Sequence, residues 1–182
     1  AEGDEYYLDD DMPGSIGRMR SYYGNFGNLV RAYTYIKALG LDGLRDVSGH
    51  AVLNANYLRV KMKELGFKVP FDRINMHEFV AQPPDGLRTL DIAKALLDHG
   101  VHPMTVYFPL VIKESMMVEP TETESLETLD AYVAVLATVL ERAAADPDYL
   151  HGAPYTTPVR RLDEVKAARQ PVLKHDFAEL GG

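Results

Sequence analysis

The stretch that decides the fold is Leu44–Gly66, "LRDVSGHAVLNANYLRVKMKELG", which carries the strongest periodic pattern in the chain. Its apolar residues recur every three or four positions, at Leu44, Val47, Ala51, Ala55, Leu58, Met62 and Leu65. This spacing places them on one face of an α-helix, and glycine at position 66 is a common helix terminator. The stretch therefore predicts a helix that packs one side against a core.

Before this helix, a first helix is predicted from about Asn25 to Gly40. Its apolar residues also have helical spacing, at Leu29, Val30, Tyr33, Ile36 and Leu39. Gly40 supplies the stop. We expect the face that bears Leu29, Tyr33 and Ile36 either to pack on the rest of the domain or to form a homodimer.

After Gly66 the pattern changes to short β-like runs. The runs are "FKVPF" (67–71), "HEFVAQ" (77–82), "TVYFPLVI" (105–112) and "SMMVEP" (115–120). Apolar, β-branched and aromatic residues in short runs between turn residues predict strands. Between the second and third runs, Thr89 is the predicted N-cap of a helix that ends at Gly100.

The C-terminal third opens with a predicted capping box, in which Thr121 reaches to Glu124. An apolar stripe then runs to Leu140 and predicts a long helix. Beyond Pro147 the chain is punctuated by prolines, and one short helix is predicted near Leu162–Arg169.

Together these elements predict an α/β fold, in which short strands alternate with helices over short connections. We expect a two-layer sandwich of a small, mostly antiparallel sheet with helices on one face, plus an N-terminal helical arm. Residues 25–150 would form this domain. Residues 1–24 would be the tail of a preceding segment, and 151–182 would be a proline-rich tail.

The composition is that of an ordinary globular protein, with 46% hydrophobic and 25% charged residues among 182. A net charge of -8 disfavours nucleic acid as a partner, because a phosphate backbone would be repelled. No apolar run is long enough to span a membrane, and the acidic N-terminus is unlike a signal peptide, so we expect a cytoplasmic protein. The absence of cysteine excludes disulfides, thiolate metal sites and a thiol nucleophile.

The loop "SIGRMRSYYGNFG" (15–27) offers the first candidate site. Glycines let backbone amides approach an anion and arginines neutralise it, which would suit a phosphate or a substrate. The loop lacks the spacing of a phosphate-binding P-loop, and a plain turn into a helix explains it equally well.

A second candidate is the pair His77 and Glu78. If both lie on a strand they point to opposite faces, so one could act as acid, base or stacking group while the other is structural. A polar pair that simply opens a strand is the alternative. His99 and His102 have no third ligand at defined spacing, so we interpret them as surface residues of a turn and predict no metal site.

Three further groups lie where chemistry is often found. Glu119, Thr121 and Glu122 occupy a strand-to-helix junction, although capping alone would explain Thr121. Arg160 and Arg161 could clamp a carboxylate or bridge to Asp163 and Glu164 on the surface. The residues alone assemble no complete catalytic constellation.

Several long strings resemble one family. They are "SIGRMRSYYGNFGNLVRAYTYIKALG", "AVLNANYLRVKM", "MHEFVAQPP", "TLDIAKALLDHGVHPMTVYFPLVIKESMMVEPTETESLETLDAY" and "APYTTPVRRLDE". They are similar to the C-terminal part of glycine dehydrogenase (decarboxylating), the pyridoxal-phosphate P-protein of the glycine cleavage system, in its subunit 2 form. The resemblance extends from about Tyr6 to Phe177.

The resemblance implies a small C-terminal domain of a fold-type I enzyme, whose large domain carries pyridoxal phosphate. In that family glycine loses its carboxylate as carbon dioxide, and the aminomethyl group passes to the lipoyl arm of H-protein. The expected partners are the large domain, the other subunit of the enzyme and lipoylated H-protein.

The family's cofactor lysine lies in a His-Lys-Thr setting, and no lysine of this chain has that setting. The resemblance therefore implies a fragment that is inactive alone and binds no cofactor by itself. The alternative is a stand-alone, non-catalytic binding or regulatory module with the same fold.

The resemblance also marks candidate site residues without giving their roles. The opening loop follows the cofactor segment in family order, and the strings "HEF" and "EPTE" match family strings. The candidates for lining the site are Arg18, Ser21, Gly24, Asn25, Gly27, His77, Glu78, Glu119 and Thr121.

Overall fold

The computed structural model describes residues 3–7, 9, 11–19, 22–146 and 148–174. The chain divides into two compact units, Ala1–Arg45 and Asp46–Gly182, and each is described by itself. Within the described residues, no helix combines the length and the apolar character needed to cross a membrane.

Helix α1 (Phe26–Glu64) contains both helices that the sequence predicts, and Gly40 interrupts it with φ 64° and ψ -173°. This conformation is open almost only to glycine, because a Cβ atom would clash with the backbone. The predicted stop at Gly40 is therefore confirmed. In the first unit Leu29, Tyr33 and Ile36 are exposed, and the homodimer that they suggested stays a prediction.

The second half of α1 buries the face that its periodicity predicts, at Ala55, Leu58 and Met62. Its end is a Schellman motif. The Gly66 N–H donates to the Lys63 carbonyl at 2.9 Å, and the Phe67 N–H donates to the Met62 carbonyl at 3.1 Å. Gly66 has φ 90°, which the motif requires, and Phe67 is buried beside the helix that it closes.

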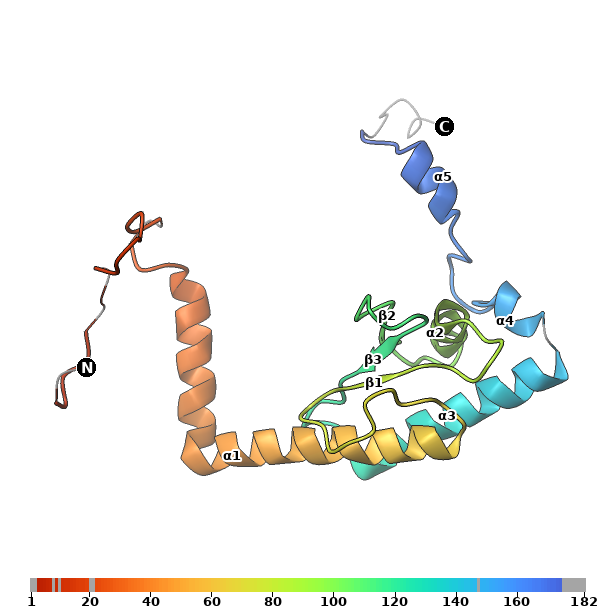
Figure 1. Ribbon diagram of the computed structural model, residues 1–182, viewed down its shortest axis with the longest axis horizontal. Coiled ribbons are helices and arrows are strands. Elements are labelled where there is room, and N and C mark those ends of the chain that lie inside the picture. Colours follow the sequence, from red (N-terminus) through yellow and green to blue (C-terminus); the bar gives the residue numbers. More distant parts are fainter. Residues whose placement is uncertain (1–2, 8, 10, 20–21, 147, 175–182) are drawn as a thin grey trace. The chain divides into compact units, whose positions relative to one another are not determined.

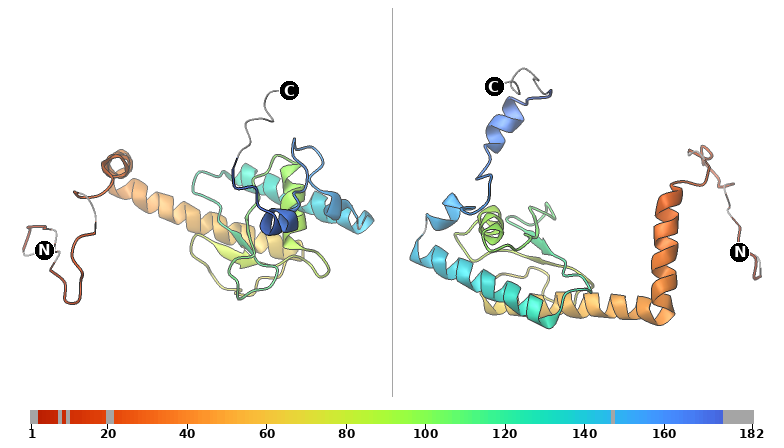
Figure 2. Two further views of the ribbon diagram at one scale, coloured as in Figure 1. Left: turned by 90° about the horizontal axis from the view of Figure 1, so that it is seen from above. Right: turned by 180° about the vertical axis from the view of Figure 1, so that it is seen from behind.

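The sheet has three antiparallel strands in the order β1-β3-β2: β1 (Phe79–Ala81), β2 (Thr105–Val106) and β3 (Met116–Val118). Phe79 pairs with Val118 and Thr105 pairs with Met117. In Figures 1 and 2, α3 (Leu126–Ala145) and the second half of α1 lie on the same side of this sheet. A small, mixed helix–strand fold with an antiparallel sheet is thus confirmed.

One predicted strand is wrong, and another is shorter than predicted. The run "FKVPF" contributes only one isolated bridge, between Lys68 and Gln82, because Pro70 lacks an N–H to continue a ladder. The run "TVYFPLVI" is extended only at its first two residues. Tyr107 then adopts φ 59°, and Pro109 cannot donate to a sheet, so the chain turns.

The N-terminal caps also differ from the predictions. In α2 (Thr89–Leu97) the N-cap is Arg88, and Thr89 is the first helical residue. The cap group is the Glu114 carboxylate, which accepts the Thr89 N–H at 2.9 Å. The Thr89 hydroxyl donates to the Glu114 carbonyl at 2.6 Å, which explains why this threonine is buried.

Helix α3 begins after Ser125, whose hydroxyl accepts the Thr128 N–H at 3.3 Å. The predicted capping box at Thr121 is therefore wrong. Asn54 of α1 donates to the carbonyls of Thr121 and Glu124, at 2.9 and 3.1 Å, and holds those residues in a turn that precedes the helix.

The C-terminal segment packs against α2 through α4 (Tyr149–Gly152) and the residues that follow it. Arg161 donates to Asp91 at 2.6 Å and to the Leu150 and Ala153 carbonyls. Of its two predicted alternatives, Arg161 contacts a carboxylate, that of Asp91, rather than Asp163 or Glu164. The predicted short helix is confirmed as α5 (Glu164–Arg169).

Candidate functional site

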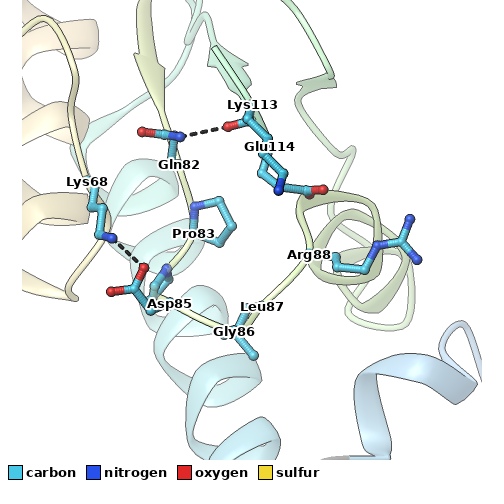
Figure 3. Close-up of a pocket in the computed structure, with 10 residues that line it drawn as sticks. Lys68, Gln82, Pro83, Asp85, Gly86, Leu87, Arg88, Lys113 and Glu114 are labelled. Carbon is cyan, nitrogen blue, oxygen red and sulfur yellow. Dashed lines mark hydrogen bonds and ion pairs between the residues drawn. The ribbon is translucent and has the colours of Figure 1, made fainter.

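Two of the cavities of the second unit differ in polarity, and the smaller one is the more polar of the two. It has a volume of about 360 Å³ and lies between the turn that precedes α2 and the residues before β3 (Figure 3). Lys68 forms an ion pair with Asp85 on one wall, and the Gln82 side chain donates to the Lys113 carbonyl at 2.7 Å on another. Its Glu114 carboxylate caps α2. These polar groups hold the walls in place, and no predicted site residue lies among them.

The larger cavity has a volume of about 560 Å³. Its walls are the loop after α2 (99–104), the exit of β3 (118–121) and the first half of α3, with Leu58 of α1. This volume is within the range of roughly 300–1,000 Å³ that is usual for small-molecule pockets. Glu119 and Thr121, two of the predicted site residues, line it.

Local sequence explains how these two residues reach the cavity. Pro120 cannot extend the β3 ladder, so the strand ends and the chain turns at Thr121. The Glu124 N–H closes this turn on the Thr121 carbonyl at 3.2 Å, and Asn54 anchors it to α1. Sequence reasoning missed Asn54, because its local sequence is that of any polar residue on a helix. Only its hydrogen bonds to the distant Thr121 and Glu124 carbonyls distinguish it.

His77 and Glu119 are brought together, with Nε2 and Oε1 3.8 Å apart. Both are about half exposed, so solvent screens the pair and it contributes little to stability. His77 and Glu78 precede β1 rather than lying on it, so the expectation of opposite strand faces does not apply. His77 is exposed and Glu78 is half-buried.

The candidates in the first unit form a capped turn. The Asn25 side chain accepts the Asn28 N–H at 3.3 Å and so caps α1, and Gly27 lies in the first turn of that helix. The preceding Gly24 has φ 106°. The Arg18 guanidinium lies over the Tyr23 ring, 5.2 Å from its centre. Ser21 lies outside the described residues.

Two buried polar atoms belong to residues that line the larger cavity. The Tyr132 hydroxyl on α3 and His99 Nε2 in the loop after α2 have no hydrogen-bond partner among the described residues. Burial raises the pKa of Tyr132, so its hydroxyl is protonated at neutral pH. The interpretation of His99 as a surface residue is wrong, because it is half-buried and its Nε2 atom is sealed from solvent.

The charges around this cavity have one sign. Glu119 and Glu124 line it, and the described lining residues include no lysine or arginine. Across the described residues, no group of three or more His, Asp or Glu side chains could hold a metal ion. The arrangement offers hydrogen-bond groups and negative charge on a mostly apolar surface.

Comparison with a family model gives a match over residues 47–148, to the model described as "Glycine dehydrogenase, C-terminal domain". The matched range lies inside the second structural unit, which begins at Asp46. It contains both cavities and the candidate residues His77, Glu78, Glu119 and Thr121.

Curated relatives extend the likeness to nearly the whole chain. A probable glycine dehydrogenase (decarboxylating) subunit 2 from Thermus thermophilus is 56% identical over 170 residues, which cover 93% of this chain and 35% of the relative. The protein of the same name from Staphylococcus aureus is 52% identical over 179 residues, 96% of this chain and 36% of the relative. The chain thus spans about 35% of the length of such relatives.

A solved structure is similar as well. It is the crystal structure of glycine decarboxylase (P-protein) of the glycine cleavage system in inhibitor-bound form. The TM-score is 0.54 at 26% sequence identity, and the superposed part covers 58% of this chain and 24% of that one.

Proposed function

Because this chain belongs to the glycine dehydrogenase (decarboxylating) family, in which it matches the C-terminal domain, we propose that it serves as that domain of a subunit 2 enzyme. The observation that carries the proposal is the agreement of two boundaries. The family match begins at residue 47 and the second compact unit begins at Asp46. The family match therefore begins where the second unit begins and lies wholly within it.

The activity that we propose for the whole enzyme is decarboxylation of glycine with pyridoxal phosphate, followed by passage of the aminomethyl group to the lipoyl arm of H-protein. In this proposal a preceding large domain of fold type I carries the cofactor, and the present chain forms the small domain beside it. The other subunit of the enzyme is the second proposed partner, since the curated relatives are named as subunits.

The residues of this chain do not fit the cofactor by themselves. Pyridoxal phosphate is held covalently by a lysine amine, and the described lining of the larger cavity has none. Lys61 pairs with Glu64, while Lys63 and Lys68 pair with Asp72 and Asp85. The sequence has no His-Lys-Thr string either. We therefore assign the cofactor lysine to another part of the whole enzyme.

For the glycine site we propose supporting roles. Glu119 is 3.8 Å from His77, so the two elements present a carboxylate and an imidazole side by side. Arg18 offers a positive charge and Gly24 an accessible backbone amide. We propose that these residues, together with Ser21, Asn25, Gly27, Glu78 and Thr121, line or support the site of the whole enzyme.

A chimera tests the proposed function. The segment of the Thermus thermophilus relative that matches this chain is replaced by this chain, and the product is combined with its partner subunit and lipoylated H-protein. We expect it to release labelled carbon dioxide from carboxyl-labelled glycine. A chimera that binds pyridoxal phosphate but releases no carbon dioxide would contradict the proposal.

The inactivity of the chain alone has a separate test. The chain is mixed with pyridoxal phosphate, reduced with borohydride and digested for mass spectrometry. We expect no lysine to be labelled stoichiometrically. One lysine labelled in every molecule would show that this chain holds the cofactor after all.

A further inference from the structure

We propose that the loop between β2 and β3, residues 107–114, docks on the preceding large domain of the enzyme, in an apolar pocket of that domain that is bordered by carboxylates. This inference rests on the proposed function, which supplies the large domain. Four features of the loop support it: exposed apolar side chains, a fixed backbone, strained residues at both ends and unpaired positive charges.

The tip of the loop, residues 107–111, exposes large apolar side chains. Leu110 and Val111 are 86% and 84% exposed, and Phe108 and Tyr107 are 52% and 38% exposed. Apolar residues scattered singly over a surface need no explanation, whereas apolar residues that gather on a surface mark a contact with another molecule. Here only Pro109 separates the two exposed pairs, so the tip is an expected contact.

Hydrogen bonds hold the backbone of the loop, so its exposure is not that of a loose segment. At its start the Tyr107 N–H donates to the Ser115 carbonyl at 2.8 Å, and the Ser115 hydroxyl donates to the Pro109 carbonyl at 3.2 Å. Near its end the Gln82 side chain donates to the Lys113 carbonyl at 2.7 Å. A loop that is ordered before it meets a partner loses little conformational entropy on docking.

Strained residues stand at both ends of the loop. Tyr107 has φ 59° and Glu114 has φ 50°. This left-handed conformation is unfavourable for residues with a Cβ atom, and it persists where surrounding contacts enforce it, commonly in functional segments. The chain thus keeps the apolar tip in one conformation at a cost to its own stability, which favours a role in contact over a role in folding.

The unpaired charges beside the tip are positive. The Arg88 guanidinium donates to the Tyr107 hydroxyl at 3.4 Å. Arg88 and Lys113 are exposed, and neither forms an ion pair within the described part of the chain. The neighbouring Glu114 carboxylate already accepts the Thr89 N–H at 2.9 Å. Because the whole sequence has a net charge of -8, two unpaired cations here predict carboxylates on the surface that meets the tip.

The size of the tip favours the large domain as its occupant over a free protein. A stable interface between free proteins buries about 800 Å² on each partner and uses roughly 20–30 residues a side, which one loop does not provide. A domain of the same polypeptide is held at a high effective concentration, so a small contact suffices. The Thermus thermophilus relative has the length for such a domain, since this chain covers 35% of it.

Zero-length cross-linking in the chimera identifies the occupant. A carbodiimide couples a lysine amine to a carboxylate that it contacts, and mass spectrometry identifies the joined peptides. With the partner subunit and H-protein present, we expect Lys113 to be joined to an aspartate or glutamate of the large domain. The matched control is Lys113→Arg, which keeps the charge and should abolish the link. A link from Lys113 to the partner subunit or to H-protein, or none outside this chain, would overturn the proposal.

Substitutions in the tip test the apolar contact. Leu110→Ser and Val111→Ser together should leave the melting temperature of this chain alone unchanged, because both side chains are exposed. They should lower that of the chimera by about 5 °C, since there the side chains are covered. The control Val172→Ser makes the same kind of change at a residue that is 90% exposed and lies outside the loop, and it should alter neither. An unchanged melting temperature of the doubly substituted chimera would contradict docking.

Carbon dioxide release by the same chimera separates this inference from the proposed function. A chimera that shows the link but releases no carbon dioxide counts against the proposed function and leaves the docking in place. A chimera that releases carbon dioxide without the link counts against the docking alone.

Discussion

Two buried polar regions of the second unit differ in how well their groups are paired. At α2, Asp91 is 1% exposed, and its carboxylate contacts Arg161 at 2.6 Å and His151 at 3.2 Å. In the larger cavity, the buried Tyr132 hydroxyl and His99 Nε2 have no partner among the described residues. The first region is closed by the chain itself. The second leaves two buried polar atoms unpaired, which carries a desolvation cost.

The largest expected effect comes from breaking the paired region. Asp91→Ala leaves the Arg161 guanidinium partly buried without its carboxylate, and loss of one partner of a buried pair costs roughly 3–5 kcal/mol. Because Arg161 is 31% exposed, we expect the lower end, about 3 kcal/mol less free energy of unfolding. Urea denaturation followed by circular dichroism measures it. A loss near zero would mean that water replaces the pair.

The opposite sign is expected in the unpaired region. Tyr132→Phe removes a buried hydroxyl that makes no hydrogen bond, so its desolvation cost disappears. We expect the free energy of unfolding of the ligand-free chain to rise by about 1 kcal/mol. The same urea titration applies. A decrease would show that the hydroxyl already has a partner, such as a buried water, and would weaken the comparison.

The dependence of stability on acid should also show the effect of a paired carboxylate, that of Asp98 at the end of α2. Burial alone would raise the pKa of Asp98, but hydrogen bonds from Thr156 and Tyr155 outweigh it and lower the pKa. The carboxylate therefore stabilises the fold above the pKa of an unfolded aspartate, about 4, and this contribution is lost as pH falls through the lower folded pKa.

The matched variant for this prediction is Asp98→Asn, which keeps the shape of the side chain. Wild type should be more stable than Asp98→Asn at neutral pH, and the difference should shrink as the pH falls below about 4. Thermal melts from pH 7 to pH 3 measure it. A difference that is constant with pH would mean that the charge of Asp98 is not what holds the segment at Tyr155 and Thr156.

The smallest effect is expected at an exposed ion pair. Asp85→Ala breaks the ion pair with Lys68. The Asp85 side chain is 90% exposed and the Lys68 side chain is 54% exposed. Exposed pairs contribute roughly 0–1 kcal/mol, so we expect a loss of about 0.5 kcal/mol or less by urea denaturation. A loss comparable to that of Asp91→Ala would show that burial does not separate the two kinds of pair.

Local signals in the sequence predicted the helices well. Gly66 and Gly100 end α1 and α2 in the same motif, since each adopts positive φ and precedes a residue that bonds back into the helix. The glycine and the apolar stripe before it are readable without knowledge of the fold. The break at Gly40 is local in the same way.

Features that depend on distant partners were not predictable in this way. The cap of α2 is Glu114, twenty-five positions from Thr89 in the sequence, so no N-terminal pattern could reveal it. "FKVPF" has strand composition, but only Lys68 finds a bridge partner. Composition describes which residues tolerate a sheet, whereas pairing depends on the neighbouring strand.

The candidate site shows the same division. Glu119 and Thr121 were singled out from their place between a strand and a helix, and both line the larger cavity. Tyr132 gave no signal, because in the sequence it is one of several large residues on an amphipathic helix. Only the fold reveals that its hydroxyl is buried without a partner among the described residues.

The contact between Asp91 and Arg161 also sets an order of events during synthesis. The two residues are 70 positions apart, and a ribosome that adds about 5–20 residues per second needs several seconds to cover that distance. During this interval Asp91 has no guanidinium and remains hydrated. Helix α2 can reach its final environment only after the segment that carries Arg161 has emerged, so a segment made later completes the burial of a helix made earlier.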